Sequence, residues 1–391
     1  MTSFLSGMNL DLCGAGVGLK IFEEYINGEE KKMEEALGGI FKDTPMFALT
    51  EEDLNIQYRS KLGEGAFCTV YPCHIRSRAT NTFDESLPPF ALKKLRRDLQ
   101  GMELNEAYED LRQEAAIMRG IKHNNLVPLI GMSEQKDDIL TNKLFIVVEK
   151  LESTLDKKLE EWHKLFGRKK KRTPKDTVKL RLEEVVLGIA QGLGFMHSKR
   201  VMYRDLKPGN VGFTYSGTVK IFDFGLAVRL REGTKLQGKA GTVRYMAPEI
   251  SRNKPYDLSA DVFSFAILLW QIITSRTPFE KEIPKMDFGP PKMIPEGKRP
   301  PLKYVENQDL GKLLEVCWAE NPSQRWNFDS ITMELQHIIE ARRYALHCSC
   351  HLESGQRDPQ CSLHAWIDTL ECSDEESSDE ESSDEESSDE E

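Results

Sequence analysis

Residues 202–225 read MYRDLKPGNVGFTYSGTVKIFDFG, and the rest of the chain is best interpreted from this stretch. Two carboxylates, Asp205 and Asp223, flank an alternating run, VKIF, that is typical of a short strand. A loop, a strand and a second loop would bring both carboxylates and the Asn210 amide to one side. Asp and Asn oxygens are ligands that Mg²⁺ prefers, alongside phosphate oxygens. A carboxylate beside Lys207 can also receive a hydroxyl proton, so the stretch predicts a site for metal binding and proton transfer.

Negative charge is concentrated at one end of the chain. The 391 residues carry a net charge of −11, but residues 371–391 hold 13 acidic and no basic side chains, which leaves +2 for the remainder. A nearly neutral body gives no indication of nucleic-acid binding. Residues 373–391 repeat S-D-E-E every five residues, and such dense like charge predicts a disordered tail. A protein whose acidic tail binds basic partners is therefore one alternative function.

Cysteine use and hydropathy predict an intracellular protein. The eight cysteines are scattered, so reduced thiols are expected. The N-terminus lacks the basic start of a secretory signal, and the longest apolar run, 265–270, is far shorter than the roughly 20 residues of a membrane span. We expect no membrane span and a cytoplasmic location, with the nucleus as the alternative. The basic run RKKKR at 168–172 fits nuclear localisation, an acidic partner or an ordinary solvated loop.

Upstream of the opening stretch, the pattern predicts a small β-rich region. Glycines in the turn GEGAFC, residues 63–68, would let backbone N–H groups approach phosphates, with an ordinary hairpin turn as the alternative. Lys93 lies in the third predicted strand. Apolar residues three or four apart predict a helix over 105–121, with Glu114 in its middle. The five predicted strands are 56–62, 69–75, 90–95, 126–132 and 143–149.

Downstream, the pattern changes to helices. A polar segment, 226–245, is closed by Met246-Ala247-Pro248-Glu249. A nearly all-apolar run with one acid, Asp261, predicts a buried helix. A cluster of Cys and His at 347–364 offers zinc ligands, but its spacing is not that of a standard finger. Two helices are predicted between the β-rich region and the opening stretch, at 155–166 and 178–199. Three more are predicted downstream of that stretch, at 259–274, 310–318 and 331–339.

Taken together, these motifs resemble the protein kinase family, and most closely its tyrosine-kinase-like Ser/Thr members. The resemblance covers about residues 56–340 and implies an α+β, bilobal kinase fold. Its small lobe, 56–149, would hold five antiparallel strands and one helix, and its larger lobe, 150–340, would be mostly helical. Residues 1–55 are then a partly helical extension and 341–391 a tail with the acidic repeats. The motifs occur in the order of the Gly65 loop, Lys93, Glu114, Asp205 with Asn210, Asp223, Glu249, Asp261 and Arg325.

The resemblance implies ATP-dependent transfer of the γ-phosphate to Ser/Thr hydroxyls of protein substrates in signal transduction. Asp205 would orient and deprotonate the hydroxyl, and Lys207 would steady the γ-phosphate. Lys93, held by Glu114, would contact the α- and β-phosphates. Mg²⁺ would be held by Asn210 and Asp223. The implied nucleotide-binding residues are Leu62, Gly63, Gly65, Val70, Ala91, Lys93, Val148, Glu149 and Leu151.

Two residues depart from the family pattern, Cys68 in place of a glycine and Tyr203 in place of a histidine. A pseudokinase that keeps the fold as a scaffold is therefore the second alternative function. In the family, the position of Tyr203 packs beneath Phe224 in a column of stacked side chains, which predicts that an aromatic ring fits there.

The resemblance also assigns positioning and regulatory roles. Glu249 is expected to pair with Arg325, and Asp261 to anchor the backbone of the catalytic loop. Arg204, which precedes Asp205, would receive a phosphate on Thr234 and so order the segment.

Overall fold

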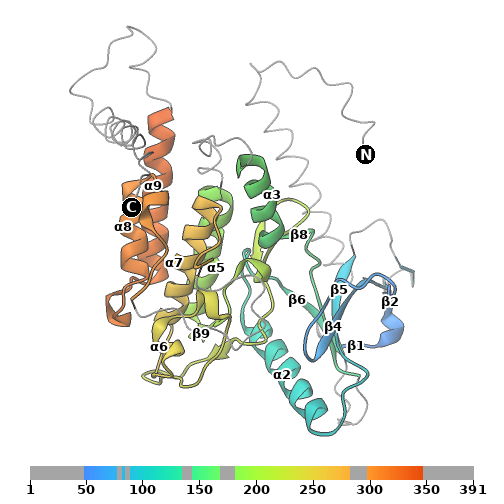
Figure 1. Ribbon diagram of the computed structural model, residues 1–391. Helices are drawn as coiled ribbons and strands as arrows, with labels where there is room; N and C mark the ends of the chain where they lie inside the picture. Colours follow the sequence, from blue (N-terminus) through green and yellow to red (C-terminus); the bar gives the residue numbers. More distant parts are fainter. Residues whose placement is uncertain are drawn as a thin grey trace, which may run out of the picture. The chain divides into compact units, whose positions relative to one another are not determined.

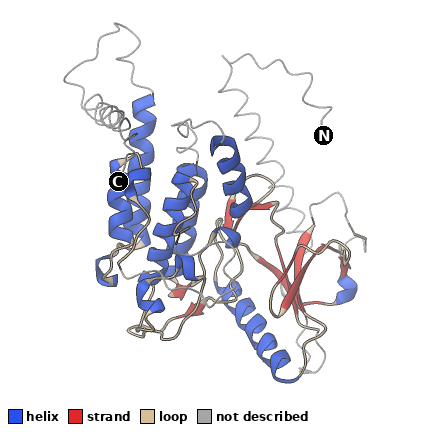
Figure 2. Ribbon diagram, in the orientation of Figure 1, coloured by secondary structure: helices blue, strands red, loops and turns tan. Residues whose placement is uncertain are grey.

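The computed structural model describes residues 48–76, 82–83, 89–133, 143–167, 181–281 and 297–346. These residues form two compact units. The first unit holds the described residues up to Lys158 together with Pro208–Arg229, and the second holds the described residues of Leu159–Lys207 and those from Leu230 onward. The large β-sheet belongs to the first unit and most helices belong to the second (Figures 1 and 2).

The sheet of the first unit has seven strands among the described residues, in the order β1-β6-β7-β5-β4-β2, with β3 paired to β4. The pairs are antiparallel except that β1 runs parallel to β6. The bounds are β1 Ala48–Leu49, β2 Leu54–Ile56, β3 Gly63–Glu64, β4 Cys68–Ile75, β5 Phe90–Leu95, β6 Leu129–Ser133 and β7 Phe145–Val148.

The sheet has two chemically different faces because side chains alternate along each strand. On β5, Phe90 and Leu92 point to one face, where they join a fully apolar cluster. Ala91 and Lys93 point to the opposite face, toward α2 (Gly101–Gly120). The apolar cluster consists of Leu49, Leu54, Cys73, Ile75, Phe90, Leu92, Ile130, Phe145 and Val147.

The prediction of one strand over 56–62 was wrong. Polar residues 57–61 do not alternate with apolar ones, and the chain turns there, with the Ser60 N–H donating to the Gln57 carbonyl at 3.0 Å. The extended backbone resumes only at Gly63, inside the segment predicted to be a turn. The sheet also begins before residue 56, because β1 and β2 already belong to it, joined by the 3₁₀ turn η1 (Glu51–Asp53).

The hairpin of β10 (Val211–Phe213) and β11 (Val219–Ile221) groups with the first unit, although the sequence placed it in the larger lobe. β10 also pairs with β8 (Ser153–Thr154). The reason is backbone hydrogen bonding, since Ile221 donates to the Asn125 carbonyl at 2.8 Å and Val127 donates back to Ile221 at 2.9 Å. Asn210 and Asp223 are thereby placed in the same unit as Lys93.

The second unit is built around α7 (Ser259–Thr274), whose bounds match the prediction and which is buried along almost its whole length. Apolar side chains lie on all sides of this helix, as expected for a helix surrounded by protein. α8 (Gln308–Cys317) packs against α7, and α9 (Phe328–Leu346) packs against α5 (Leu187–Ser198). A π-helical turn, η3 (Leu182–Val186), precedes α5.

Other predicted helices form with shifted ends. α2 begins four positions before the predicted 105, because Leu104 extends the apolar stripe toward the N-terminus. α3 runs Leu155–Gly167, close to the prediction. Among the described residues no helix is long and apolar enough to cross a membrane. The remaining short elements are β9 Val201–Met202, η4 Pro208–Asn210, β12 Val228–Arg229, η5 Val243–Tyr245, α6 Pro248–Ser251, η6 Leu302–Tyr304 and η7 Pro322–Gln324.

Several predictions lie outside the described residues. They are the helical part of the extension within 1–47, the basic run 168–172, the Cys and His cluster 347–364 and the acidic repeats 373–391.

Candidate active site

Lys93 is the centre of a charged cluster in the first unit. Its Nζ lies 2.9 and 2.7 Å from the two carboxylate oxygens of Glu114 and 2.8 Å from Oδ1 of Asp223. Glu114 is buried because it occupies a position in the apolar stripe of α2, between Leu111 and Met118. The cluster therefore joins β5, α2 and the loop after β11, and it brings together three residues that the sequence predicted to cooperate.

Two carboxylates share one ammonium group in this cluster, and this sets their electrostatics. Burial alone would lower the pKa of Lys93, but Glu114 and Asp223 outweigh burial and raise it above its usual range. Burial raises the pKa of the Glu114 carboxyl, and Lys93 offsets only part of that effect. Lys93 therefore stays charged at working pH, and the exposed carboxylate of Asp223 beside it can bind a further cation.

Asp223 and Asn210 provide oxygen atoms suited to such a cation. Asp223 adopts φ 60°, in the left-handed region, and its side chain is 45% exposed. The Phe222 N–H donates to the Asn210 carbonyl at 3.0 Å, which fixes the chain just before Asp223 beside Asn210. Asn210 is itself buried. These hard oxygen donors fit Mg²⁺, which takes one or two protein ligands and completes its shell with phosphate and water oxygens. In the described residues no larger cluster of His, Cys, Asp and Glu suits a metal ion.

The register of the sheet places the predicted nucleotide-binding residues on one face. Val70 is opposite Lys93, and Ala91 is opposite Val148. Gly63 is opposite Val70. Residues directly opposite in antiparallel strands share a face, so all of these lie on the face that carries Lys93. Leu62 is 47% exposed and donates its N–H to the Val70 carbonyl at 2.9 Å.

The turn of the glycine loop is closed by a backbone hydrogen bond from Gly65 N–H to the Cys68 carbonyl at 2.8 Å. Cys68 is buried, and burial raises the pKa of its thiol to about 11. The side chain that replaces a glycine of the family pattern thus points inward as a neutral, apolar group. It leaves the turn itself able to form.

Glu149 and Lys220 form a partly buried ion pair that the sequence did not predict. The Lys220 Nζ lies 3.3 Å from Glu149 Oε2 and donates to the Asn124 carbonyl at 2.9 Å. Lys220 is on β11, three residues before Asp223, so the pair links the end of β7 to the strand that leads to Asp223. Leu151 lies close to Gly212, where an added Cβ would meet Leu151 Cδ1 at 2.6 Å.

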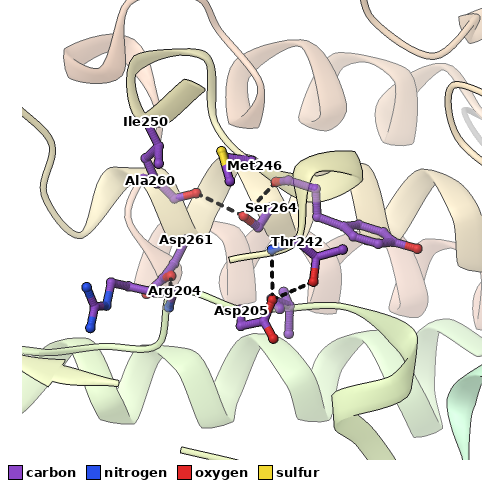
Figure 3. A pocket seen from close by; sticks show the side chains of 10 residues that line it. Arg204, Asp205, Thr242, Met246, Ile250, Ala260, Asp261 and Ser264 are labelled. Carbon is purple, nitrogen blue, oxygen red and sulfur yellow. Dashed lines mark hydrogen bonds between the residues drawn. The ribbon is translucent and has the colours of Figure 1, made fainter. Parts of the chain in front are cut away.

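In the second unit, Asp205 accepts hydrogen bonds on both carboxylate oxygens. Lys207 Nζ donates to Oδ2 at 2.6 Å. The backbone N–H and the hydroxyl of Thr242 donate to Oδ1 at 2.9 and 2.7 Å (Figure 3). A carboxylate held in this way is oriented, and it lies within hydrogen-bond reach of a hydroxyl group, as a general base must.

Asp261, on α7, holds the backbone that presents Asp205. Its Oδ1 accepts from the Arg204 N–H at 2.8 Å, and its Oδ2 accepts from the Tyr203 N–H at 2.8 Å. His197 Nε2 lies 2.9 Å from Oδ2. Arg204 adopts φ 70°, a conformation that needs support from its surroundings. The small cavity of Figure 3 is lined by Arg204, Asp205, Leu206, Thr242, Tyr245, Met246, Ile250, Ala260, Asp261 and Ser264.

Two further contacts support this arrangement. Gly241 has φ 95°, and a Cβ at this position would lie 2.3 Å from the Arg204 carbonyl oxygen, so only glycine fits. Arg325 forms a two-pronged ion pair with Glu249, at 2.7 and 2.9 Å, and both side chains are buried. The predicted pairing of Glu249 with Arg325 and the predicted anchoring by Asp261 are both present.

A comparison with protein families decides the assignment. Residues 56–337, well over half of the chain, match the family model described as the protein kinase domain. The chain belongs to the protein kinase family.

The kinase is similar to several curated relatives. Serine/threonine-protein kinase STY17 of Arabidopsis thaliana is 32% identical over 235 residues, which are 60% of this chain and 38% of that protein. Dual specificity protein kinase shkD of Dictyostelium discoideum is 30% identical over 299 residues, 76% of this chain and 36% of that protein. Serine/threonine/tyrosine-protein kinase HT1 of Arabidopsis thaliana is 34% identical over 181 residues, 45% of this chain and 46% of that protein. The kinase spans less than half the length of each.

Sequence reasoning missed several residues of this kinase. Lys220 and His197 gave no signal, because each lies in an ordinary strand or helix pattern and finds its carboxylate partner far along the chain. Tyr203 is fully buried, but its predicted packing with Phe224 joins residues of different units and stays a prediction. Thr234 donates its hydroxyl to the Arg231 carbonyl at 2.7 Å, and its phosphorylation likewise stays a prediction.

Proposed function

We propose that this chain is an active serine/threonine protein kinase, which transfers the γ-phosphate of ATP to Ser or Thr hydroxyls of protein substrates in intracellular signalling. The observation that carries the proposal is the cluster of Lys93 with Glu114 and Asp223. In this cluster the ammonium group of Lys93 contacts both the buried carboxylate of Glu114 and the exposed carboxylate of Asp223. A protein that kept the fold only as a scaffold would not need this arrangement.

Each group has a role that follows from its chemistry. Lys93 is a cation for the α- and β-phosphates, and Glu114 fixes its position. Mg²⁺ held by Asp223 and Asn210 would offset the charge of the phosphates. Asp205 orients the substrate hydroxyl and accepts its proton, and Lys207 steadies the γ-phosphate. Catalysis would rest on positioning and electrostatics rather than on a covalent intermediate.

The nucleotide would lie on the sheet face that carries Val70, Ala91 and Val148. Its adenine would meet backbone groups at Glu149 and Leu151, and its phosphates the N–H groups of the glycine loop, residues 63–68. This placement is supported by the strand register, which gathers the apolar residues and Lys93 on one face.

Preference for Ser and Thr over Tyr is supported by the contact of Thr242 with Asp205, which keeps the segment 241–245 close to the catalytic carboxylate. Relatives named serine/threonine-protein kinases agree with this preference. Other relatives are named dual specificity or serine/threonine/tyrosine kinases, so the test below also includes tyrosine as an acceptor. An intracellular setting, with the cytoplasm as its principal site, is supported by the free, buried cysteines of the described residues.

The test uses the purified full chain with ATP, MgCl₂ and three peptide pools that differ only in carrying Ser, Thr or Tyr as the acceptor. We expect phosphate on Ser and Thr, and an Asp205→Asn variant should lose about 10²–10⁴-fold in rate. Asp329→Asn, which changes an exposed acid in the first turn of α9, is the matched control and should keep the wild-type rate.

Equal, negligible transfer by the wild type and Asp205→Asn would overturn the enzyme proposal and favour a scaffold. Transfer to Tyr at a rate equal to Ser and Thr would overturn the specificity alone.

A further inference from the structure

The segment of the second unit that contacts Asp205 through Thr242 is strongly basic. Residues 230–245, the activation segment of this kinase, carry four cations and one acid. Three of the cations are exposed and the fourth is half-buried. The exposed cations are Arg231, Lys235 and Lys239, the half-buried one is Arg244, and the acid is Glu232.

This segment is fixed beside the catalytic carboxylate. Thr242 donates to Asp205 through both its N–H and its hydroxyl, at 2.9 and 2.7 Å. Lys239 lies three residues before Thr242 and is therefore within about 10 Å of it along the chain. Leu236 exchanges two backbone hydrogen bonds with Tyr256, at 2.8 and 2.9 Å, which holds the middle of the segment against residues 253–257.

Acids in the same part of the second unit cancel only part of this charge, because Asp257 forms an ion pair with Lys235 and the other cations of the segment outnumber the remaining acid, Glu232. Asp257 accepts from both the N–H and the hydroxyl of Ser259, and it lies 3.4 Å from Lys235. Glu249 is occupied by its buried ion pair with Arg325. A further exposed cation, Lys254, adjoins the segment. The surface beside Asp205 therefore keeps a net positive charge, and it would attract a peptide with acids around its hydroxyl.

The chain itself contains such a peptide. Residues 373–391 carry seven serines among twelve acids, with no cation, and four of these serines are each followed directly by Asp-Glu-Glu. The tail lies outside the described residues. Its charge is complementary to that of the activation segment, and its Ser hydroxyls are acceptors of the kind that the proposed reaction requires.

We infer that this kinase selects Ser residues surrounded by acids, and that it phosphorylates the serines of its own acidic repeats. This rests on the proposed function. In each event the Ser oxygen forms a bond to the γ-phosphorus of ATP as the bond to the β–γ bridging oxygen breaks. ADP leaves with that electron pair, and the Ser proton passes to Asp205 and then to water.

The first experiment maps autophosphorylation. The full chain is treated with phosphatase, freed of it and incubated with ATP and Mg²⁺, and the phosphates are located by mass spectrometry. We expect them within 373–391 in the wild type, and none in an Asp205→Asn chain treated in the same way. Phosphates confined to other segments would overturn the assignment of the tail.

The second experiment measures charge preference with the wild-type chain. Three peptides are compared: the sequence 373–391, the same sequence with Asn and Gln in place of Asp and Glu, and one with Lys in their place. We expect kcat/KM to be at least about tenfold higher for the acidic peptide than for the amide peptide, with a difference that shrinks as salt is added. Equal rates on the acidic and amide peptides would overturn the inference while leaving the proposed function intact, whereas no transfer to any peptide would count against the proposed function.

The third experiment asks whether the activation segment is the source of the preference. In the triple variant Arg231→Gln, Lys235→Gln, Lys239→Gln the ratio of the acidic to the amide rate should fall toward one. A matched triple variant, Arg112→Gln, Lys164→Gln, Lys312→Gln, removes the same charge from exposed helix positions and should keep the ratio. An unchanged ratio in the first variant, or an equal fall in both, would contradict the role of the segment.

Discussion

Replacing Asp261 by Asn tests how the second unit presents Asp205, the proposed general base. Asp261 is 1% exposed and accepts from the N–H groups of Tyr203 and Arg204 and from His197. Asn keeps the shape of the side chain but replaces one acceptor oxygen by an NH₂ donor. At least one buried donor then faces another donor, and the remaining bonds lose the assistance of a charge.

The expected loss of stability follows from these contacts. A buried polar group without a partner costs about 1–3 kcal/mol, and bonds to a charged acceptor are stronger than neutral ones. Asp261→Asn should therefore lower the free energy of unfolding of the second unit by about 2–4 kcal/mol. Because Arg204 adopts φ 70° and precedes Asp205, relaxation of its backbone should also displace the catalytic carboxylate. A displacement near 1 Å can reduce the rate by about 10²-fold.

Urea unfolding and steady-state kinetics measure the two effects on the same preparation. We expect a lower midpoint and a reduced kcat, with KM for ATP near the wild-type value because the residues proposed to bind the nucleotide lie in the first unit. Asp329→Asn, an exposed change in the same unit, should alter stability by less than about 0.5 kcal/mol. Wild-type stability and kcat in Asp261→Asn would show that Asp261 does not hold the backbone before Asp205, and a parallel rise in KM for ATP would show that the effect is not confined to the second unit.

Three further changes probe separate contacts. Arg325→Met should cost about 3–5 kcal/mol in thermal or urea unfolding because it leaves Glu249 charged and buried, and a loss below about 1 kcal/mol would contradict the buried pair. Gly241→Ala should reduce kcat strongly with the fold retained by circular dichroism, since its Cβ would clash with the Arg204 carbonyl, and normal kcat would show that the close approach does not matter. Glu114→Gln should lower kcat by about 10²-fold through a mobile Lys93, measured with saturating ATP, and an unchanged kcat would remove this residue from the catalytic group.

The sequence predicted those parts of the fold that depend on local pattern. The α7 run, Ser259–Thr274, is apolar over four turns, so both its type and its ends could be predicted. The strand over 56–62 failed because the apolar residues at its ends suggested extension, while the polar residues between them turn to satisfy their own backbone groups.

Contacts between distant residues could not be predicted from spacing. Lys93 and Asp223 are 130 positions apart, and their cooperation was expected only from the family resemblance. No local pattern and no motif in the sequence predicted the ion pair of Lys220 with Glu149. The grouping of Pro208–Arg229 with the sheet depends on backbone hydrogen bonds to Asn125 and Val127, which only the folded chain reveals.

The two aspartates are proposed to have separate roles. Asp223 would bind Mg²⁺ and through it the nucleotide, and Asp205 would accept the proton of the substrate hydroxyl. The affinity for ATP should be measured by titration with and without Mg²⁺ for Asp205→Asn and Asp223→Asn. The rate of phosphate transfer should be measured on the same two variants. We expect Asp205→Asn to bind Mg²⁺-ATP like the wild type but to lose about 10²–10⁴-fold in transfer, whereas Asp223→Asn should lose the enhancement of ATP binding by Mg²⁺. Wild-type transfer by Asp205→Asn, or a full Mg²⁺ effect in Asp223→Asn, would contradict these separate roles.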